Sequence, residues 1–121
     1  MRSVAQWYGL KLKPVAVDAI LDQHHVLGLG QSMQLNILHA PGHNPGSLSA
    51  WCQQAKWLKV LFGQDVRGPF SPSFSSDLER WRLSMQALLE LDCDILAEGH
   101  YGIFRPAVEV AGFIYKQLGM H

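Results

Sequence analysis

The stretch HAPGHNPGS, residues 39–47, decides which fold the chain is expected to adopt. Its prolines and glycines exclude a helix and predict a tight turn with His43 at the apex. A strand is predicted before it at residues 34–39, and apolar and polar side chains alternate after it at residues 48–52. A rigid, exposed turn between strands is a good platform for a metal ligand or an acid/base group. His43 is therefore the first candidate functional residue.

Further strands extend outward from this turn in both directions. The pattern predicts strands at residues 15–20, 26–30, 34–39, 48–52, 57–62 and 93–97. The 57–62 run is apolar almost throughout, which is typical of a central strand covered on both faces. Residues 53–56 are expected to form a hairpin connection, and His24 and His25 a solvated turn. Residues 1–13 show no clear period, and no element is predicted there.

Two helices are predicted from apolar stripes at helical spacing. The first spans about residues 77–91, with Ser76 as its cap and Glu79 reaching back in a capping box. The second begins at Pro106, a favourable first helical residue, and ends at Gly119. Each has one apolar face, so each is expected to cover a sheet. The stripes are Leu78, Trp81, Met85, Leu88 and Leu89 in the first helix, and Ala107, Val110, Ala111, Ile114, Tyr115 and Leu118 in the second.

Length and charge predict a single domain over residues 1–121 and exclude several kinds of partner. Ten basic and ten acidic residues leave no net charge, so neither nucleic acid nor a membrane surface is an expected partner. No run approaches the roughly 20 apolar residues that span a bilayer, and the first residues lack a signal-peptide pattern. Cys52 and Cys93 are expected to be free, buried thiols, which indicates a reducing compartment. The expected location is the cytoplasm.

Three polar side chains follow three separate predicted strands. They are His43, Asp65 in the segment GQD, and His100 in the segment EGH. In a sheet, such positions gather at one edge although they are far apart in sequence. Two imidazoles and a carboxylate suit zinc or another first-row metal. Residue types alone leave a second interpretation open, in which His43 and His100 are ordinary loop residues.

The order of these motifs resembles the C-terminal half of the metallo-β-lactamase superfamily of metal-dependent hydrolases. A strand with APGHNPGS, a strand ending in LFGQD, a helix and then ILAEGH follow one another as they do in that family. The resemblance covers about residues 15–118. It implies an α/β fold that is half of an αββα sandwich. One mainly antiparallel or mixed sheet would be covered by two helices.

Carried over residue by residue, the resemblance makes His43 and His100 metal ligands. Asp65 becomes the carboxylate that bridges two metals and serves the catalytic centre. The implied metal is zinc, or else iron or manganese. Arg67, in the following loop, is a candidate for contact with an anionic substrate. Further candidates, which would support the ligands or face the substrate, are His39, Asn44, Ser47 and Tyr101.

Two features depart from the family pattern. Gln64 stands where the family usually has Gly before the bridging Asp, and its side chain could crowd the metals. The HxHxDH motif, which supplies most of the other ligands in the family, is absent from this sequence. The three remaining residues are too few for two closed zinc sites, which normally take three or four protein ligands each.

The resemblance implies cleavage of an ester, thioester, lactam or phosphoester by a metal-bound hydroxide. Without HxHxDH, the chain is expected to be a truncated relative that is incomplete or inactive as a lone chain. One alternative is a non-catalytic homodimer that binds metal weakly or not at all. Another is a subunit that completes a hydrolase with a second chain carrying HxHxDH. Half a sandwich would expose an apolar sheet face, which predicts a homodimer through that face.

Overall fold

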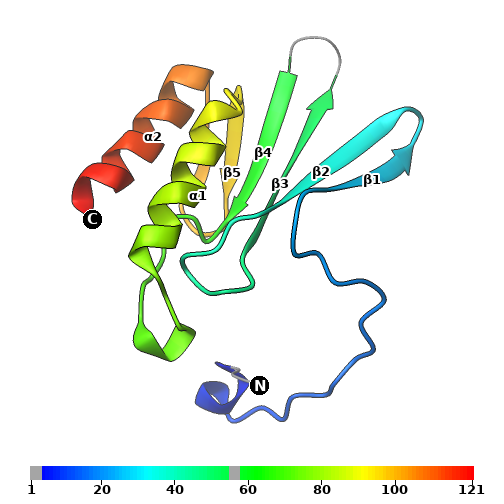
Figure 1. Cartoon of the computed structure of the whole chain (residues 1–121), viewed down its shortest axis with the longest axis vertical. Coiled ribbons are helices and arrows are strands. Elements are labelled where there is room, and N and C mark those ends of the chain that lie inside the picture. Colours follow the sequence, from blue (N-terminus) through cyan, green and yellow to red (C-terminus); the bar gives the residue numbers. More distant parts are fainter. Residues whose placement is uncertain (1–3, 55–57) are drawn as a thin grey trace.

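The sheet of this protein is assembled in chain order, so that each strand pairs with the one before it. The computed structural model describes residues 4–54 and 58–121, and their strands form one six-stranded sheet (Figure 1). The elements are the 3-10 helix η1 (Val4–Tyr8), β1 (His25–Gly30), β2 (Met33–His39), β3 (Leu48–Gln54), β4 (Leu58–Gln64), the 3-10 helix η3 (Pro72–Phe74), α1 (Leu78–Glu90), β5 (Ile95–Glu98), β6 (Gly102–Phe104) and α2 (Ala107–Met120). The predicted α/β class, with one sheet and two α-helices, is confirmed.

Neighbouring strands run antiparallel except β4 and β5, which run parallel. A parallel pair needs a crossover connection, and α1 provides it. The sheet is therefore mixed. The sequence pattern does not predict β6, because its three residues are too few to show alternation. β6 pairs with β5 and lies beside α2 at the edge of the sheet.

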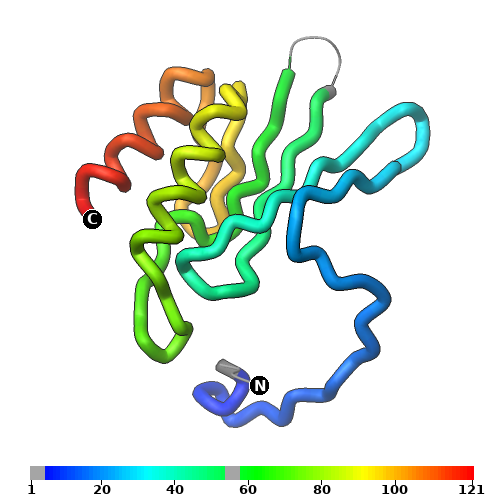
Figure 2. Tube along the Cα trace, viewed as in Figure 1, coloured from blue at the N-terminus to red at the C-terminus, as the bar shows by residue number. Residues whose placement is uncertain are grey.

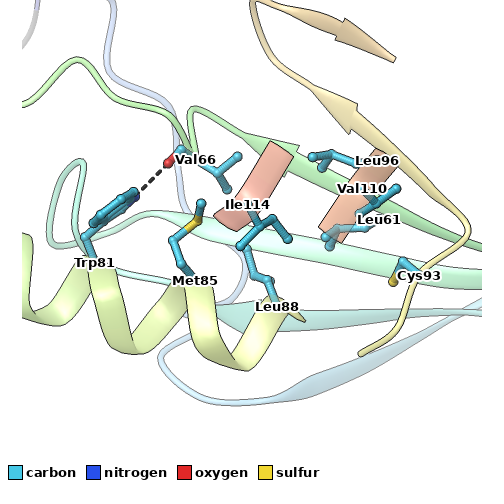
Figure 3. Packing of buried hydrophobic residues seen from close by; sticks show 9 residues of the cluster. All are labelled: Leu61, Val66, Trp81, Met85, Leu88, Cys93, Leu96, Val110 and Ile114. Carbon is cyan, nitrogen blue, oxygen red and sulfur yellow. Dashed lines mark hydrogen bonds between the residues drawn. The ribbon is translucent and has the colours of Figure 1, made fainter. Parts of the chain in front are cut away.

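The core lies between the sheet and the two α-helices, which pack on the same face (Figure 3). Leu61 of β4 pairs with Leu96 of β5, and neither side chain is exposed to solvent. The side chains that cover them are those of Trp81, Met85, Leu88, Val110 and Ile114. The Trp81 indole N–H also donates to the carbonyl oxygen of Val66 at 2.7 Å, drawn as the dashed line in Figure 3. This bond fastens the start of α1 to the loop after β4.

The opposite face of the sheet is apolar, and no helix packs on it in the part of the chain that the structure describes. Paired residues on neighbouring strands share a face, so the register defines two rows of side chains across the sheet. The rows are Leu27, Leu35, Cys52, Val60 and Ile95, and His25, Ile37, Ala50, Phe62, Ala97 and Ile103. We call these two rows the open face. Phe62 on it is 45% exposed and Ile103 is 70% exposed.

Within residues 4–54 and 58–121, the central strand β4 is covered on one face only, so the prediction that both of its faces are covered is wrong. Leu61 is buried under the helices, whereas its neighbour Phe62 faces solvent on the open face. A continuous apolar run therefore marks a strand with two apolar faces, of which only one is covered by the residues that the structure describes. Gln53 and Gln54, the first half of the predicted hairpin connection, belong to β3, and residues 55–57 lie outside the described residues.

The strand predicted at residues 15–20 is absent. Figure 2 shows the segment before β1 leaving the sheet and running to η1. The side chains that suggested a strand are mostly solvent-exposed, Val15 by 82% and Ile20 by 80%. Alternation produces a strand only where a neighbouring strand supplies hydrogen-bond partners. The described residues supply none for this segment, so it stays extended without forming a ladder.

The cap of α1 differs from the predicted capping box. Asp77, not Ser76, is the N-cap, and its carboxylate accepts the backbone N–H groups of Glu79 and Arg80, both at 3.0 Å. The Ser76 hydroxyl instead donates to the carbonyl oxygen of His43 at 2.6 Å. Ser76 and Asp77 are both favourable N-cap residues. Because the Ser76 hydroxyl is bonded to the turn around His43, Asp77 caps the helix.

The last helix also differs in its details from the prediction. Pro106 is the N-cap and not the predicted first helical residue, so the helix begins at Ala107, and it continues through Gly119 to Met120. Tyr115, assigned to the apolar stripe, is 61% exposed, whereas Gln117 is buried. The buried face of α2 therefore differs from the predicted stripe, because it includes Gln117 and excludes Tyr115.

Both cysteines are free, as predicted; Cys93 is buried and Cys52 half-buried. Within residues 4–54 and 58–121, neither α-helix has the length and apolar character that a membrane crossing requires.

Candidate functional site

One edge of the sheet collects the ends of β2, β4 and β5. The parallel strands β4 and β5 end there side by side, and the antiparallel β3 begins there, so the turn between β2 and β3 lies at the same edge. His43 is in that turn, Asp65 follows β4 and His100 follows β5. The topology therefore brings together three side chains that are widely separated in sequence.

The carboxylate of Asp65 lies between the two imidazoles. Its Oδ2 atom is 3.6 Å from Nε2 of His43, and its Oδ1 atom is 3.0 Å from Nε2 of His100. The side chain of His43 is 12% exposed and that of His100 is 64% exposed. Each histidine thus uses a different oxygen of one carboxylate. In the described part of the chain, no three or more His, Cys, Asp or Glu side chains form a ready cage for a metal ion.

A backbone carbonyl fixes the orientation of the His43 ring. Nδ1–H of His43 donates to the carbonyl oxygen of Pro69 at 2.6 Å. Because a carbonyl only accepts, Nδ1 carries a hydrogen, and Nε2 is the nitrogen that faces Asp65. The ring of Phe74 lies 5.2 Å from the His43 ring, centroid to centroid, and the ring of Trp7 lies 5.9 Å from Phe74. Pro69 is a site residue that the sequence pattern does not reveal.

Helix α1 contacts one side of the turn at residues 39–47, which we call the Pro/Gly turn. The N–H of Asp77 donates to the carbonyl oxygen of Gly42 at 2.9 Å, and the hydroxyl of Ser84 donates to that of Pro41 at 2.7 Å. Gly42 has φ +150°, and a Cβ there would lie 2.3 Å from Cβ of Trp81. Only glycine lets the turn approach the helix this closely. The position of His43 therefore depends on the packing of α1.

The loop of Asp65 is fastened to the loop of His100. The N–H of Gly99 donates to the carbonyl oxygen of Gln64 at 2.8 Å. Gln64 has φ +55° and its side chain is exposed. A Cβ at position 99 would lie 2.8 Å from Oδ1 of Asp65. The absence of a side chain at Gly99 thus gives the carboxylate its room.

A buried carboxylate supports the backbone of His100. Oε2 of Glu98 accepts the N–H groups of His100 at 2.7 Å and Tyr101 at 2.8 Å. Glu98 is 7% exposed, and its Oε1 atom has no hydrogen-bond partner among the described residues. Glu98 is a further site residue that was not predicted, although the segment EGH contains it. The signal was an acidic residue at the end of an otherwise apolar strand.

Three predicted supporting residues bind the Pro/Gly turn itself. Nε2–H of His39 donates to the carbonyl oxygen of Pro45 at 2.7 Å. Oδ1 of Asn44 accepts the N–H of Gly46 at 2.9 Å, and the Ser47 hydroxyl accepts the N–H of Asn44 at 3.4 Å. These side chains shape the turn through local bonds.

Tyr101 and Arg67, by contrast, meet beside the site. The guanidinium carbon of Arg67 lies 3.9 Å from the centroid of the Tyr101 ring. His24 directly precedes β1 and is exposed, whereas His25 begins that strand and is half-buried, so the solvated turn predicted for both residues does not include His25. Neither histidine is part of the site. Nε2 of His24 is 3.3 Å from Oδ1 of Asn36, a contact within the β1–β2 hairpin region.

Solved structures similar to this chain include several metallo-β-lactamases and a protein of the same superfamily. An archaeal metallo-β-lactamase superfamily protein from Sulfolobus tokodaii matches with a TM-score of 0.65 and 18% identity, over 95% of this chain and 54% of that chain. A metallo-β-lactamase with a HARLDQ motif from Cronobacter sakazakii gives 0.72 and 19%, over 92% and 51%. A subclass B3 metallo-β-lactamase from a soil metagenome library gives 0.66 and 21%, over 90% and 53%.

No family model and no curated protein matches the sequence itself. The present chain spans about half the length of each of these three solved proteins.

Proposed function

We propose that this chain, which has the fold of one half of a metallo-β-lactamase sandwich, supplies half of a metal-dependent hydrolytic centre. The observation that carries the proposal is the shared carboxylate of Asp65, with Nε2 of a different histidine at each oxygen. A carboxylate that spans two donors in this way is suited to bridge two metal ions.

The donor atoms fit a metal ion in a further respect. With Nδ1 protonated toward Pro69, Nε2 of a neutral His43 presents a lone pair to an oxygen of Asp65. Two lone pairs facing one another need a cation, which is either a proton or a metal ion. Metal-ligating histidines are commonly oriented by a backbone carbonyl on the other ring nitrogen, as Pro69 does here.

In the proposed centre, His43 and His100 would each hold one metal ion, and the carboxylate of Asp65 would be shared by the two. A metal in such a site supplies an activated water and polarises an ester, thioester, lactam or phosphoester. The chain's own residues position this chemistry. Pro69 orients His43, Glu98 fixes the backbone of His100, and zinc, iron or manganese all suit the donor set.

Catalysis requires ligands beyond these three, because a catalytic zinc site normally takes three protein ligands for each metal. We propose that a second copy of the chain packs on the open face and rebuilds the two-sheet sandwich. A two-fold axis that runs along the strands would bring both copies of the site to the same end of the sandwich. The homodimer then holds two sets of His43, Asp65 and His100 at one edge. A separate chain that carries HxHxDH is the alternative occupant of the same face.

A non-catalytic homodimer is the second candidate function, and the apolar character of the open face favours it. An interface of that kind buries about 2,000 Å² or more and needs no metal. For either function we propose a cytoplasmic location, which the free thiols Cys52 and Cys93 support.

Zinc binding by tag-free protein tests the proposal. We expect equilibrium dialysis to show zinc retained by the native chain and lost in His43→Ala and His100→Ala, with folding unchanged by circular dichroism. His24→Ala is the matched control, because His24 lies outside the site. A native chain that retains no zinc would leave the non-catalytic homodimer. If zinc is retained, assays of the zinc-loaded chain with ester, thioester, lactam and phosphoester substrates would identify the class of reaction.

A further inference from the structure

Arg67 and Tyr101 connect the two loops that carry Asp65 and His100. Arg67 lies two residues after Asp65, and Tyr101 directly follows His100. The guanidinium carbon of Arg67 lies 3.9 Å from the centre of the Tyr101 ring, which is the range of a cation–π contact. Tyr101 is 54% exposed, and Arg67 is half-buried. The pair therefore forms a positively charged element at the border of the site.

No carboxylate of the described chain neutralises Arg67. Within residues 4–54 and 58–121, the side-chain nitrogens that lie within ion-pair distance of an Asp or Glu carboxylate are Nε2 of His43 and Nε2 of His100, both beside Asp65. Glu98, the other acidic residue of these loops, directs one oxygen to the N–H groups of His100 and Tyr101. The charge of Arg67 is thus held in place by an aromatic ring and left without an anionic partner in this part of the structure.

The guanidinium carbon of Arg67 lies over the Tyr101 ring, and no hydrogen bond within the described residues engages the N–H groups of that guanidinium. An arginine that stacks through its flat face keeps its N–H donors in the plane of the group. These donors match two oxygens of a carboxylate or phosphate in a bidentate pair. Because Tyr101 orients the plane, less side-chain freedom is lost when an anion binds.

We propose that Arg67, held by Tyr101, binds an anionic oxygen-bearing group, a carboxylate or a phosphate, on the molecule that is processed at the neighbouring centre. This inference rests on the proposed function and narrows its substrates to those that carry such a group near the bond to be cleaved. Arg67 is the binding residue, and Tyr101 is the residue that positions it.

Nuclear magnetic resonance titration of the full chain, stripped of metal with a chelating resin, tests the inference without any metal or soluble chelator. Inorganic phosphate and acetate are added separately at constant ionic strength, and the Arg67 Nε–H and Tyr101 amide signals are followed. We expect saturable shifts that are about tenfold weaker in affinity, or lost, in Arg67→Gln. Tighter binding of phosphate would indicate a phosphoryl substrate, and tighter binding of acetate a carboxylate.

Two further variants make the result specific. Tyr101→Phe keeps the aromatic ring and should bind as the native chain does, whereas Tyr101→Ala should weaken binding. Arg105→Gln, an exposed arginine beyond β6, is the matched control and should change nothing. Absence of saturable shifts in the native chain, or equal shifts in Arg67→Gln, would overturn the inference. Zinc binding is measured in a separate experiment. Anion binding without zinc binding would contradict only the hydrolytic function. Zinc binding without anion binding would contradict only the anion site.

Discussion

Gly99 lies directly against Asp65, so that a Cβ at position 99 would be 2.8 Å from Oδ1 of the carboxylate. The same Cβ would be 3.0 Å from the carbonyl oxygen of Gln64, which accepts the N–H of Gly99. The Gln64 backbone cannot yield easily, so an added Cβ would push against the side-chain carboxylate of Asp65. A glycine at this position keeps the carboxylate in its place between His43 and His100.

Replacing Gly99 by alanine should weaken metal binding without unfolding the protein. The new methyl group displaces the Asp65 carboxylate from the imidazoles, and the loss of such support typically lowers metal affinity about 10- to 100-fold. Competition with a zinc chelator measures the affinity, and circular dichroism monitors the fold. Gly46→Ala is the control, because its Cβ would meet only Oδ1 of Asn44 at an ordinary 3.6 Å. Equal zinc affinity in Gly99→Ala and native protein would contradict the assigned role of Asp65.

The spatial clustering of His43, Asp65 and His100 could be predicted because each follows a strand with a clear apolar pattern. Strand ends meet at sheet edges, so sequence order sufficed to bring the three together. The supporting residues could not be predicted in the same way. Pro69 acts through its carbonyl oxygen, and Glu98 accepts from backbone N–H groups. Such roles depend on the path of the backbone, which side-chain patterns do not record.

The other errors of prediction, at residues 15–20, at β6 and at the start of α1, have a different physical origin. Alternation at residues 15–20 predicted a strand, but a strand also needs a partner, and the sequence does not specify one. β6 escaped prediction because short strands are stabilised by the neighbour they pair with. The choice between Ser76 and Asp77 as the cap of α1 depended on a third residue, His43, whose carbonyl oxygen engages the serine.

Gly42→Ala should destabilise the fold strongly. The added Cβ would lie 2.3 Å from Cβ of Trp81, and the φ of +150° is unfavourable for any side chain. Separating the turn from α1 should cost about 3 kcal/mol or more. Urea unfolding measures the free energy of unfolding. Gly112→Ala serves as the opposite case, because position 112 lies inside α2 with free space around it. There alanine should raise stability by about 0.5–1 kcal/mol.

Phe62→Asp should dissociate the proposed homodimer. Phe62 lies in the open face and is 45% exposed, so the change places a charge where the second sheet would pack. Sedimentation velocity at micromolar concentration should show a dimer for the native chain and a monomer for Phe62→Asp. Val108→Asp, on the exposed side of α2, should leave the dimer intact. A native chain that sediments as a stable monomer would contradict both the dimer and the shared centre proposed from it.

Stability should fall as the pH rises through the range in which Cys93 titrates. Burial, together with the carboxylates of Asp94 and Asp92 and against the effect of Lys59, raises the pKa of the Cys93 thiol from 9.0 to about 11. The unfolded chain therefore loses this proton at a lower pH than the folded chain. The contribution is complete below pH 9 and is lost between pH 9 and about 11, up to about 2–3 kcal/mol.

Urea unfolding at pH about 8 and about 10 isolates this contribution when native protein and Cys93→Ala are compared. The variant loses some packing at both pH values, but the thiol-dependent part of the fall in stability should disappear. Cys52→Ala is the control and should keep the native pH dependence, because Cys52 is half-buried on the open face and Cys93 is 3% exposed in the core. An identical fall in native protein and Cys93→Ala would show that other groups cause it. Burial should also make Cys93 the slower thiol to react with a disulfide reagent in folded protein.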